Sequence, residues 1–308
     1  MRLLFILNPT ANGGRAAQLA NKIRSFYLEH ADDPRLGSTS PSLEIRLTEY
    51  PSHATRLAEE NAKLFDVIVA VGGDGTINEV CRGLIAAKTG QLGVIPAGTG
   101  NDTATGLELP KTLAEALWAI HESPIRHLDY GTVNGQVFIN SATVGFDALV
   151  ASHGNRIKRV LKSHWAYVIG LFTALATYHF PKIQVPQDFP AGDDWAGTQR
   201  DLCLLAVCNG RYYGGGIEIV PGATLDDELL DLCLITNISK PRLLKLLPTI
   251  LKGTHIKQKQ YLRTWKTQQF SLPVLTPTLL GIDGEISEVA VGEVLHFELH
   301  PGGINFVG

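Results

Sequence analysis

The stretch "VIVAVGGDGTINEVCRGLIAA" (residues 67–87) decides the fold of this chain. Its first five residues are apolar and mostly β-branched, which is typical of a strand buried on both faces of a parallel sheet. Apolar residues then recur at helical spacing from Ile77 to Ile85, so a helix is predicted to follow at once. Two glycines, an aspartate and a third glycine stand at the junction between the two elements.

The junction itself has the features of a phosphate cradle. Glycine permits positive φ and lets backbone N–H groups approach an anion, and the helix N-terminus adds partial positive charge. Thr76 is expected to cap the helix or to donate to a phosphate. Asp74 would repel phosphate, so it indicates either a magnesium–phosphate ligand or an acidic cap. Two adjacent glycines alone would favour a tight turn without a ligand, and the segment matches neither a P-loop nor G-x-G-x-x-G.

Strand-like and helix-like segments alternate from residue 2 to about residue 122. Strands are predicted at 2–7, 43–49, 67–71 and 92–95, and helices at 14–30, 53–65, 76–87 and 110–122. Pro110 is placed in the first turn of the last of these helices. The alternation predicts a parallel sheet with helices on both faces.

The pattern changes after residue 125. Asn134-Gly135 stands between two strand-like runs and predicts a type I′ hairpin. Further strand-like runs follow without regular helices, so a mainly β sandwich is predicted, interrupted by helical insertions at about 152–179 and 241–256. We therefore expect an α/β domain at 1–125 and a β-sandwich domain at 126–291. The segment at about 292–308 can return to the first domain.

Composition narrows the class of protein. Of the 308 residues, 44% are hydrophobic and 19% are charged, which is typical of a core-forming globular chain. The net charge of −3 gives no indication of a nucleic-acid partner.

The cysteines have no zinc-binding spacing and are expected to be buried thiols in a reducing compartment. No signal peptide is evident and the longest apolar stretch, 165–178, is too short to span a bilayer, so a cytoplasmic protein is predicted.

Two more polar loops follow predicted strands. "PAGTGND" (96–102) follows the strand at 92–95, and "NPTANGG" (8–14) follows the first strand. Ligands of α/β sheets bind beyond the carboxyl ends of the strands. The three loops are therefore expected to converge on one crevice that holds a phosphorylated ligand.

Five motifs occur in an order that identifies a family resemblance. They are "GGDGTINEV", "GTGND", "GFDA" (145–148), "PGATLDDELLDL" (221–232) and "DGE" (283–285). Together they resemble the diacylglycerol kinase catalytic-domain family, most of all its soluble bacterial YegS-like lipid kinases, which are related to sphingosine kinases and distantly to NAD kinases. "GGDGT" alone would also fit NAD kinases and phosphofructokinases. The resemblance covers nearly the whole chain and implies an NAD-kinase-like α/β domain, a β sandwich, and ATP with Mg²⁺ as cofactors.

The resemblance also implies roles for individual residues. The residues expected to bind the nucleotide are Asn8, Pro9, Thr10, Ala11, Asn12, Thr48, Gly72, Gly73, Asp74, Gly75, Thr76, Ile77, Asn78, Thr99, Asn101 and Asp102. The expected catalytic residues are Glu285 as base, its neighbour Asp283, and Asp74. A structural magnesium ion is expected on the Asp227 carboxylate and the backbone carbonyls of Thr224 and Leu229.

Two of these assignments have simpler structural alternatives, and two residues depart from the family pattern. Asp283-Gly284 is also an ordinary hairpin turn, and the acidic run at 226–231 is also an ordinary solvated turn. Glu228 stands where the family usually has glycine, which strains the loop if that position needs positive φ. Thr103 stands where an aromatic or apolar residue is common, and we do not expect this to abolish activity.

The predicted function is transfer of the γ-phosphate of ATP to a lipid hydroxyl, with diacylglycerol as the default acceptor. An NAD kinase-like enzyme with a soluble acceptor, and a catalytically silent nucleotide or lipid sensor, stay open as alternatives. Segments 155–180 and 242–263 combine basic and apolar residues. They are expected mainly to pack on the second sheet and secondarily to make peripheral contact with the inner membrane face. A homodimer is left open.

Overall fold

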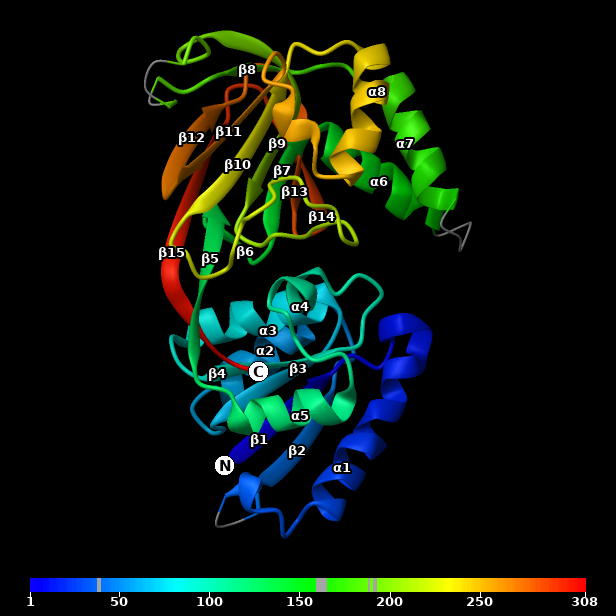
Figure 1. Cartoon of the computed structure of the whole chain (residues 1–308), viewed down its shortest axis with the longest axis vertical. Helices are drawn as coiled ribbons and strands as arrows, with labels where there is room; N and C mark the ends of the chain where they lie inside the picture. The colour runs from blue at the N-terminus through cyan, green and yellow to red at the C-terminus, as the bar shows by residue number, and fades with distance from the viewer. Residues whose placement is uncertain (38–39, 159–164, 188, 191–192) are drawn as a thin grey trace. The chain divides into compact units, whose positions relative to one another are not determined.

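The computed structural model describes the chain except residues 38–39, 159–164, 188 and 191–192, and the side chains of 154–169 and 251 also lie outside the description. The chain divides into two compact units. The first contains Met1–Tyr130, Gly214–Gly216 and Pro301–Gly308, and the second contains Gly131–Tyr213 and Ile217–His300. Figure 1 shows the elements of both units in chain order.

The first unit is built on a parallel sheet, as predicted. The strand order is β2-β1-β3-β4-β15, and the last residues of β15 pair in parallel with β4, with Phe306 opposite Leu92. The strands are β1 (Arg2–Leu7), β2 (Ser42–Leu47), β3 (Val67–Gly72), β4 (Gln91–Pro96) and β15 (Val294–Val307). The residues of β3 are buried throughout, which is why this run is continuously apolar rather than alternating.

Helices cover both faces of this sheet. On one face, α1 (Leu19–Glu29) and α5 (Leu113–Glu122) share an apolar core with side chains from β1 and β3. On the other, α2 (His53–Asn61) packs against α3 (Asp74–Ala87), which contacts β3 and β4. The carboxyl ends of the strands therefore stay open between the two helical layers.

Local details differ from the sequence expectations. The helix predicted over 14–30 is divided into η1 (Ala11–Gln18) and α1, with Asn12, Gly13 and Gly14 at positive φ inside η1. The prediction that Pro110 lies in the first turn of α5 is wrong. The helix begins at Leu113, because the Thr112 hydroxyl caps it: this oxygen accepts the Glu115 amide at 3.3 Å and donates to the Glu115 carboxylate at 2.6 Å. The short helices η2 (Pro34–Leu36) and α4 (Asp102–Gly106) were not predicted.

The second unit contains an antiparallel β sandwich, also as predicted. One sheet has the order β11-β10-β9-β7-β13-β14 with β8 on β9, and β6 and β12 pair with β5 and β15. These strands are β5 (Arg126–Val133), β6 (Gln136–Phe138), β7 (Ser141–Gly145), β8 (Lys182–Gln184), β9 (Gln199–Cys208), β10 (Leu230–Thr236), β11 (Leu262–Thr267), β12 (Gln269–Pro273), β13 (Thr278–Ile282) and β14 (Glu285–Val289). Asn134 and Gly135 have φ of 48° and 78°, which confirms the predicted type I′ turn between β5 and β6.

The two faces of the antiparallel sheet pack against different layers. Alternate residues such as Leu205 and Leu232 face the sandwich core, where Phe270 and Phe297 stack with ring centroids 4.5 Å apart. Their neighbours, such as Cys203 and Cys233, face the helices α6 (Phe146–Lys158), α7 (Trp165–Thr177) and α8 (Lys240–Leu251), followed by η3 (His255–Lys257) (Figure 1). All four cysteines are buried and free, as expected.

The helical insertions bear on membrane contact. Among the residues that the structure describes, no helix is both long enough and apolar enough to cross a bilayer. Packing is confirmed for α8, whose Leu243, Leu246 and Ile250 lie in the core against the sheet. In the segment 155–180, the side chains of Trp165 and Tyr167 lie outside the described residues.

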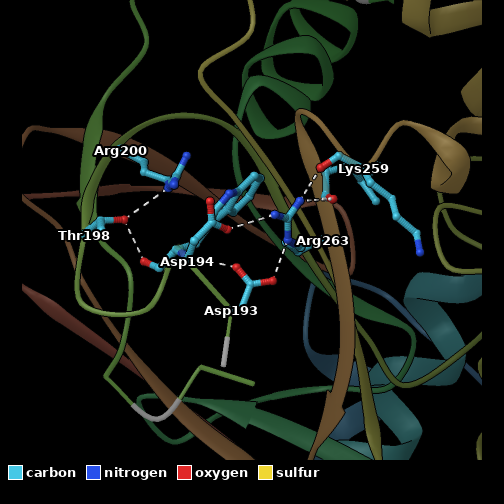
Figure 2. A network of polar contacts seen from close by, with 8 residues as sticks. Asp193, Asp194, Thr198, Arg200, Lys259 and Arg263 are labelled. Carbon is cyan, nitrogen blue, oxygen red and sulfur yellow. Dashed lines mark hydrogen bonds and ion pairs between the residues drawn. The ribbon is translucent and has the colours of Figure 1, made fainter. Parts of the chain in front are cut away.

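A polar network holds the segment before β9 against β11 (Figure 2). Arg263 donates to the carboxylates of Asp193 at 2.6 Å and Asp194 at 3.1 Å, and Arg200 donates to the Thr198 hydroxyl at 3.1 Å. Both guanidinium groups lie 4.2 Å from the ring centroid of the buried Trp195. The indole therefore contacts two cations, one of which is fixed by two carboxylates.

Candidate functional site

A cavity of about 530 Å³ lies at the carboxyl ends of the parallel strands of the first unit. Residues that follow β1, β2, β3 and β4 all contribute to its lining, which confirms that the three polar loops converge. The lining residues are Asn8, Thr10, Ala11, Asn12, Thr48, Glu49, Tyr50, Pro51, Ala54, Gly73, Asp74, Gly75, Thr76, Glu79, Gly98, Thr99 and Gly100.

The glycines after β3 are required by close approach rather than by positive φ. Gly73 is extended, with φ of −95°. A Cβ placed on Gly98 would lie 2.4 Å from the Gly73 Cα, and one on Gly72 would lie 2.3 Å from the Thr76 hydroxyl. A Cβ on Gly75 would meet nothing within 4 Å. The first glycines therefore let two loops touch backbone to backbone, and Gly75 keeps the cavity open over the helix.

The N-terminus of α3 lies at this cavity. Gly73 is its N-cap, so the expectation that Thr76 caps the helix is wrong. Thr76 lies one turn in, where its hydroxyl accepts from the Asn8 amide at 3.3 Å. The same Asn8 side chain accepts from the amide and hydroxyl of Thr10 at 3.0 and 2.8 Å. The Thr76 amide donates to the Gly73 carbonyl at 2.9 Å. The first two amides of a helix have no carbonyl one turn back, so those of Asp74 and Gly75 are suited to an anion.

Asp74 connects the loop after β3 to the loop after β4. It does not cap its own helix. Its Oδ1 accepts from the backbone N of Thr103 at 2.9 Å and from the Thr103 hydroxyl at 3.1 Å, so it caps the first turn of α4 instead. The carboxylate also lines the cavity. Sequence reasoning noted Thr103 only as a departure from the family pattern and missed this contact.

Asp102 and Asn101 shape the loop after β4 and do not line the cavity. Asp102 is buried and accepts from the amides of Gly215 at 2.8 Å and Gly216 at 2.7 Å. Burial raises the pKa of Asp102, and the nearby charge of Asp74 raises it further. The two hydrogen bonds from the Gly215 and Gly216 amides lower this pKa and offset part of the rise. The Asn101 Oδ1 accepts the Gly98 amide at 2.8 Å.

Other residues expected at the nucleotide also stay outside the lining. They are Pro9, Gly72, Ile77 and Asn78, of which Ile77 and Asn78 are buried in the first turns of α3. Their positions fit a role in holding the loops in place.

Sequence reasoning missed the part of the cavity that lies beyond β2. Glu49, Tyr50, Pro51 and Ala54 line this part. Tyr50 stacks on His53 with ring centroids 4.3 Å apart and an interplanar angle of 10°. These residues could have been found by applying the strand-end argument to β2 as well as to the other three strands.

Glu79 was also missed, although it lies within the quoted "GGDGTINEV" motif. Its two carboxylate oxygens accept from the amides of Ser52 at 2.9 Å and Ala54 at 3.1 Å. It thereby fixes the N-terminus of α2 beside the cavity.

In the second unit, Asp283 and Gly284 form the two-residue turn between β13 and β14, with φ of 45° and 90°. The hairpin alternative is therefore correct as a description of the backbone. The Asp283 carboxylate also accepts from the amides of Ile139, Asn140 and Ser141 at 2.6, 3.0 and 2.9 Å. Glu285 begins β14 and is exposed. The turn thus holds one acid rigidly and presents the other to solvent.

At the expected structural metal site, both oxygens of the Asp227 carboxylate have protein partners. One oxygen of Asp227 lies 2.8 Å from the Lys266 Nζ, and the other accepts the Leu229 amide at 3.2 Å. Among the described residues, no group of three or more His, Cys, Asp or Glu side chains could hold a metal ion. Asp74, by contrast, places a carboxylate on the cavity wall, where it fits a cation bound together with phosphate.

Comparisons with known families match both halves of the chain. Residues 2–133 match the family described as "Diacylglycerol kinase catalytic domain". Residues 140–307 match the "YegS C-terminal NAD kinase beta sandwich-like domain".

Individual relatives agree with these matches. A protein of Pseudomonas savastanoi pv. phaseolicola named "Probable lipid kinase YegS-like" is 34% identical over 267 residues, which is 85% of this chain and 82% of the relative. The "Diacylglycerol kinase" of Bacillus subtilis is 31% identical over 251 residues, 80% of each chain. A crystal structure described as a diacylglycerol kinase from Bacillus anthracis str. Sterne has the same fold, with a TM-score of 0.68, 23% identity and coverage of 99% of this chain and 96% of that one.

Proposed function

The chain belongs to the diacylglycerol kinase catalytic-domain family, whose named relatives are lipid kinases, and from that premise we propose that it transfers the γ-phosphate of ATP to a lipid hydroxyl. Diacylglycerol is the first acceptor to test, since a relative carries that substrate in its name. The observation that carries the proposal is the cavity at four strand ends, where a helix N-terminus and two touching glycine loops meet.

The first unit is proposed to bind the nucleotide. The amides at the start of α3, next to Gly73, would hold the phosphates, and the pocket beyond Thr48 has room for the nucleoside. Asp74 would hold Mg²⁺ together with the phosphates. That ion, when bound, neutralises the charge that develops during phosphoryl transfer. Thr103 occupies one oxygen of Asp74, which orients the carboxylate toward its task.

The second unit is proposed to bind the lipid and activate its hydroxyl. Glu285 is the proposed general base, because it is an exposed carboxylate beside a rigid turn. Asp283 accepts three backbone amides, which stabilise its anionic form and leave it suited to fixing the turn. We therefore assign Asp283 a positioning role and Glu285 the proton transfer.

Peripheral contact with an anionic membrane is proposed for the face formed by α7, α8 and η3. Residues 239–263 carry seven lysines and arginines and no aspartate or glutamate, in a chain with net charge −3. Phe172 on α7 and Leu244 on α8 are exposed, at 54% and 43%. Exposed apolar side chains on helices of this basic segment and of α7 suit an anionic lipid surface, which is also where the proposed acceptor is found.

The test uses purified protein, labelled ATP, mixed micelles of individual lipids and, in parallel, NAD. We expect label in a lipid product, and Glu285→Gln to lower kcat by roughly 10²–10⁴-fold while ATP binding is retained. Glu288→Gln, an exposed acid on the same strand, is the matched control and should stay fully active. Transfer of label to NAD alone would refute the assignment of a lipid acceptor. Full activity of Glu285→Gln would refute the assignment of Glu285 as the base.

A further inference from the structure

Lys266 lies between two carboxylates at the edge of the second unit. It belongs to β11 and is directly opposite Asp231 of β10 in the antiparallel register. Its Nζ is 2.8 Å from the Asp227 Oδ2 and 3.2 Å from the Asp231 Oδ2. One ammonium group thus serves the acidic turn at 224–231 and the strand that follows it.

The burial of the two acids makes this contact more than a surface ion pair. The Asp231 side chain is only 5% exposed and that of Asp227 is 27% exposed, whereas Lys266 is 43% exposed. A buried carboxylate without a cation is costly, so the turn needs a positive charge at this position.

Two further hydrogen bonds hold the backbone of the turn. The Asp227 Oδ1 accepts the Leu229 amide at 3.2 Å, and the Gln268 amide donates to the Glu228 carbonyl at 3.3 Å. Glu228 adopts φ of 61°, a conformation that favours glycine. The turn therefore keeps a strained conformation while tied to β11 and to the residue just after it.

We propose that the Lys266 ammonium takes the place of a structural divalent cation, so that the 224–231 turn is held in a metal-independent way. The Lys266 ammonium pairs with the Asp227 oxygen that a metal ion would need as a ligand. It also balances the charge of Asp231. This inference concerns the folding of the second unit and does not depend on which acceptor the enzyme uses. Any magnesium that enters with the nucleotide is a separate ion.

The test is thermal unfolding of the full chain without nucleotide, in millimolar Mg²⁺ and in excess EDTA. The Tm of the parent protein should be the same in both, within about 1 °C. Lys266→Met should lower Tm in EDTA by roughly 3–10 °C, because two carboxylates lose their cation. Magnesium should restore much of the lost Tm in the variant. Without the ammonium group, the carboxylate oxygens of Asp227 and Asp231 can bind the divalent ion instead.

Two further variants complete the test. Lys259→Met, an exposed lysine of the segment before β11, should change neither Tm nor its response to magnesium. Lys266→Arg retains a cation, so it should fold and its Tm should not depend on magnesium. This variant tests the proposal even if Lys266→Met does not fold. A parent protein whose Tm falls in EDTA would overturn the proposal, as would a Lys266→Met protein with unchanged Tm.

Discussion

Asp74 accepts two hydrogen bonds from Thr103, so the acid after β3 fixes the first turn of the helix after β4. Thr103→Val removes the hydroxyl bond and keeps the shape of the side chain. We expect the free energy of unfolding to fall by about 1.5 kcal/mol, the low end for a bond to a charged group, because Asp74 is only half-buried. ATP should also bind more weakly, since the carboxylate loses one of its two restraints.

Urea unfolding and calorimetric titration with ATP measure these two effects. Thr105→Val is the control, because the Thr105 hydroxyl bonds the Asn101 carbonyl at 2.8 Å on the same short helix without touching Asp74. It should lose stability without a specific loss of ATP affinity. Equal ATP binding by the parent protein and Thr103→Val would show that this bond does not orient the carboxylate.

Asp147 predicts a pH dependence of stability. Burial raises the pKa of this carboxyl from 3.8 to about 6, and its bonds with Thr143 and Tyr213 offset only part of the rise. Between these values the folded state holds more protons than the unfolded state, so stability falls as pH rises and levels off above about 6. The contribution lost across this window is about 2–3 kcal/mol.

Asp147→Asn isolates this contribution. The difference in unfolding free energy between variant and parent protein should grow in favour of the variant from pH about 4 to about 7. Burial lowers the pKa of His121 and of His255, which acts in the opposite direction, but both histidines are present in both proteins and cancel in the difference. A difference that is constant with pH would contradict a raised pKa at Asp147.

The alternating pattern of the first 122 residues was sufficient to predict the sheet and the convergence of its loops. Each loop follows its strand immediately in the sequence, and parallel strands must end at one edge. The sequence argument was applied to the polar loops after β1, β3 and β4 and not to the segment after β2. It therefore did not predict that Tyr50 and Pro51 line the cavity. Short-range patterns therefore located the site but not its full extent.

Other features could not be predicted because their causes are remote in sequence. Asp283 is held by amides more than 140 residues away, and Asp227 by a lysine 39 residues further on. Thr103 and Asp74 meet only because two loops pack glycine to glycine. Sequence patterns name the chemical groups, whereas tertiary packing decides which of them are paired.

Glu228 gives a prediction about backbone strain. Its φ of 61° lies in the left-handed region, which glycine adopts more easily than residues with a Cβ. This agrees with the glycine that the family usually has at this position. Glu228→Gly should raise the free energy of unfolding by up to about 1 kcal/mol, since relief of strain exceeds the added flexibility of the unfolded chain. Glu228→Ala keeps the Cβ and removes the carboxylate, so an equal gain in Glu228→Ala would assign the effect to charge instead. Chemical denaturation of all three proteins decides between the two causes.

Arg263 predicts a difference between two arginines that contact the same indole. Arg263→Lys loses the paired bonds to Asp193 and Asp194 as well as the stacking on Trp195, and should lower the free energy of unfolding by about 1–2 kcal/mol (Figure 2). Arg200→Lys loses its own contact with the Trp195 ring and one bond to a hydroxyl, and should lower the free energy of unfolding by about 0.5–1 kcal/mol. Urea unfolding followed by tryptophan fluorescence measures both losses. A larger loss for Arg200→Lys would mean that the carboxylates contribute little.

The basic face of α8 and η3 predicts binding to anionic vesicles. Lys245, Lys252 and Lys257 are exposed, and each lysine near an anionic surface contributes about 1 kcal/mol. Replacing all three by glutamate should weaken binding to vesicles that contain phosphatidylglycerol by roughly 100-fold or more. Co-sedimentation measures this binding, and the parent protein should be released by salt and should not bind neutral vesicles.

Activity separates this surface from the site of chemistry. The triple variant should keep the parent rate on a short-chain acceptor below its micellar concentration, because that substrate needs no membrane. The matched control reverses three exposed charges of the first unit, Lys22, Arg24 and Lys63, and should bind vesicles as the parent protein does. If the control loses as much binding as the α8 variant, net charge rather than this face accounts for the attraction. If neither variant changes binding, the three lysines do not lie at the lipid surface.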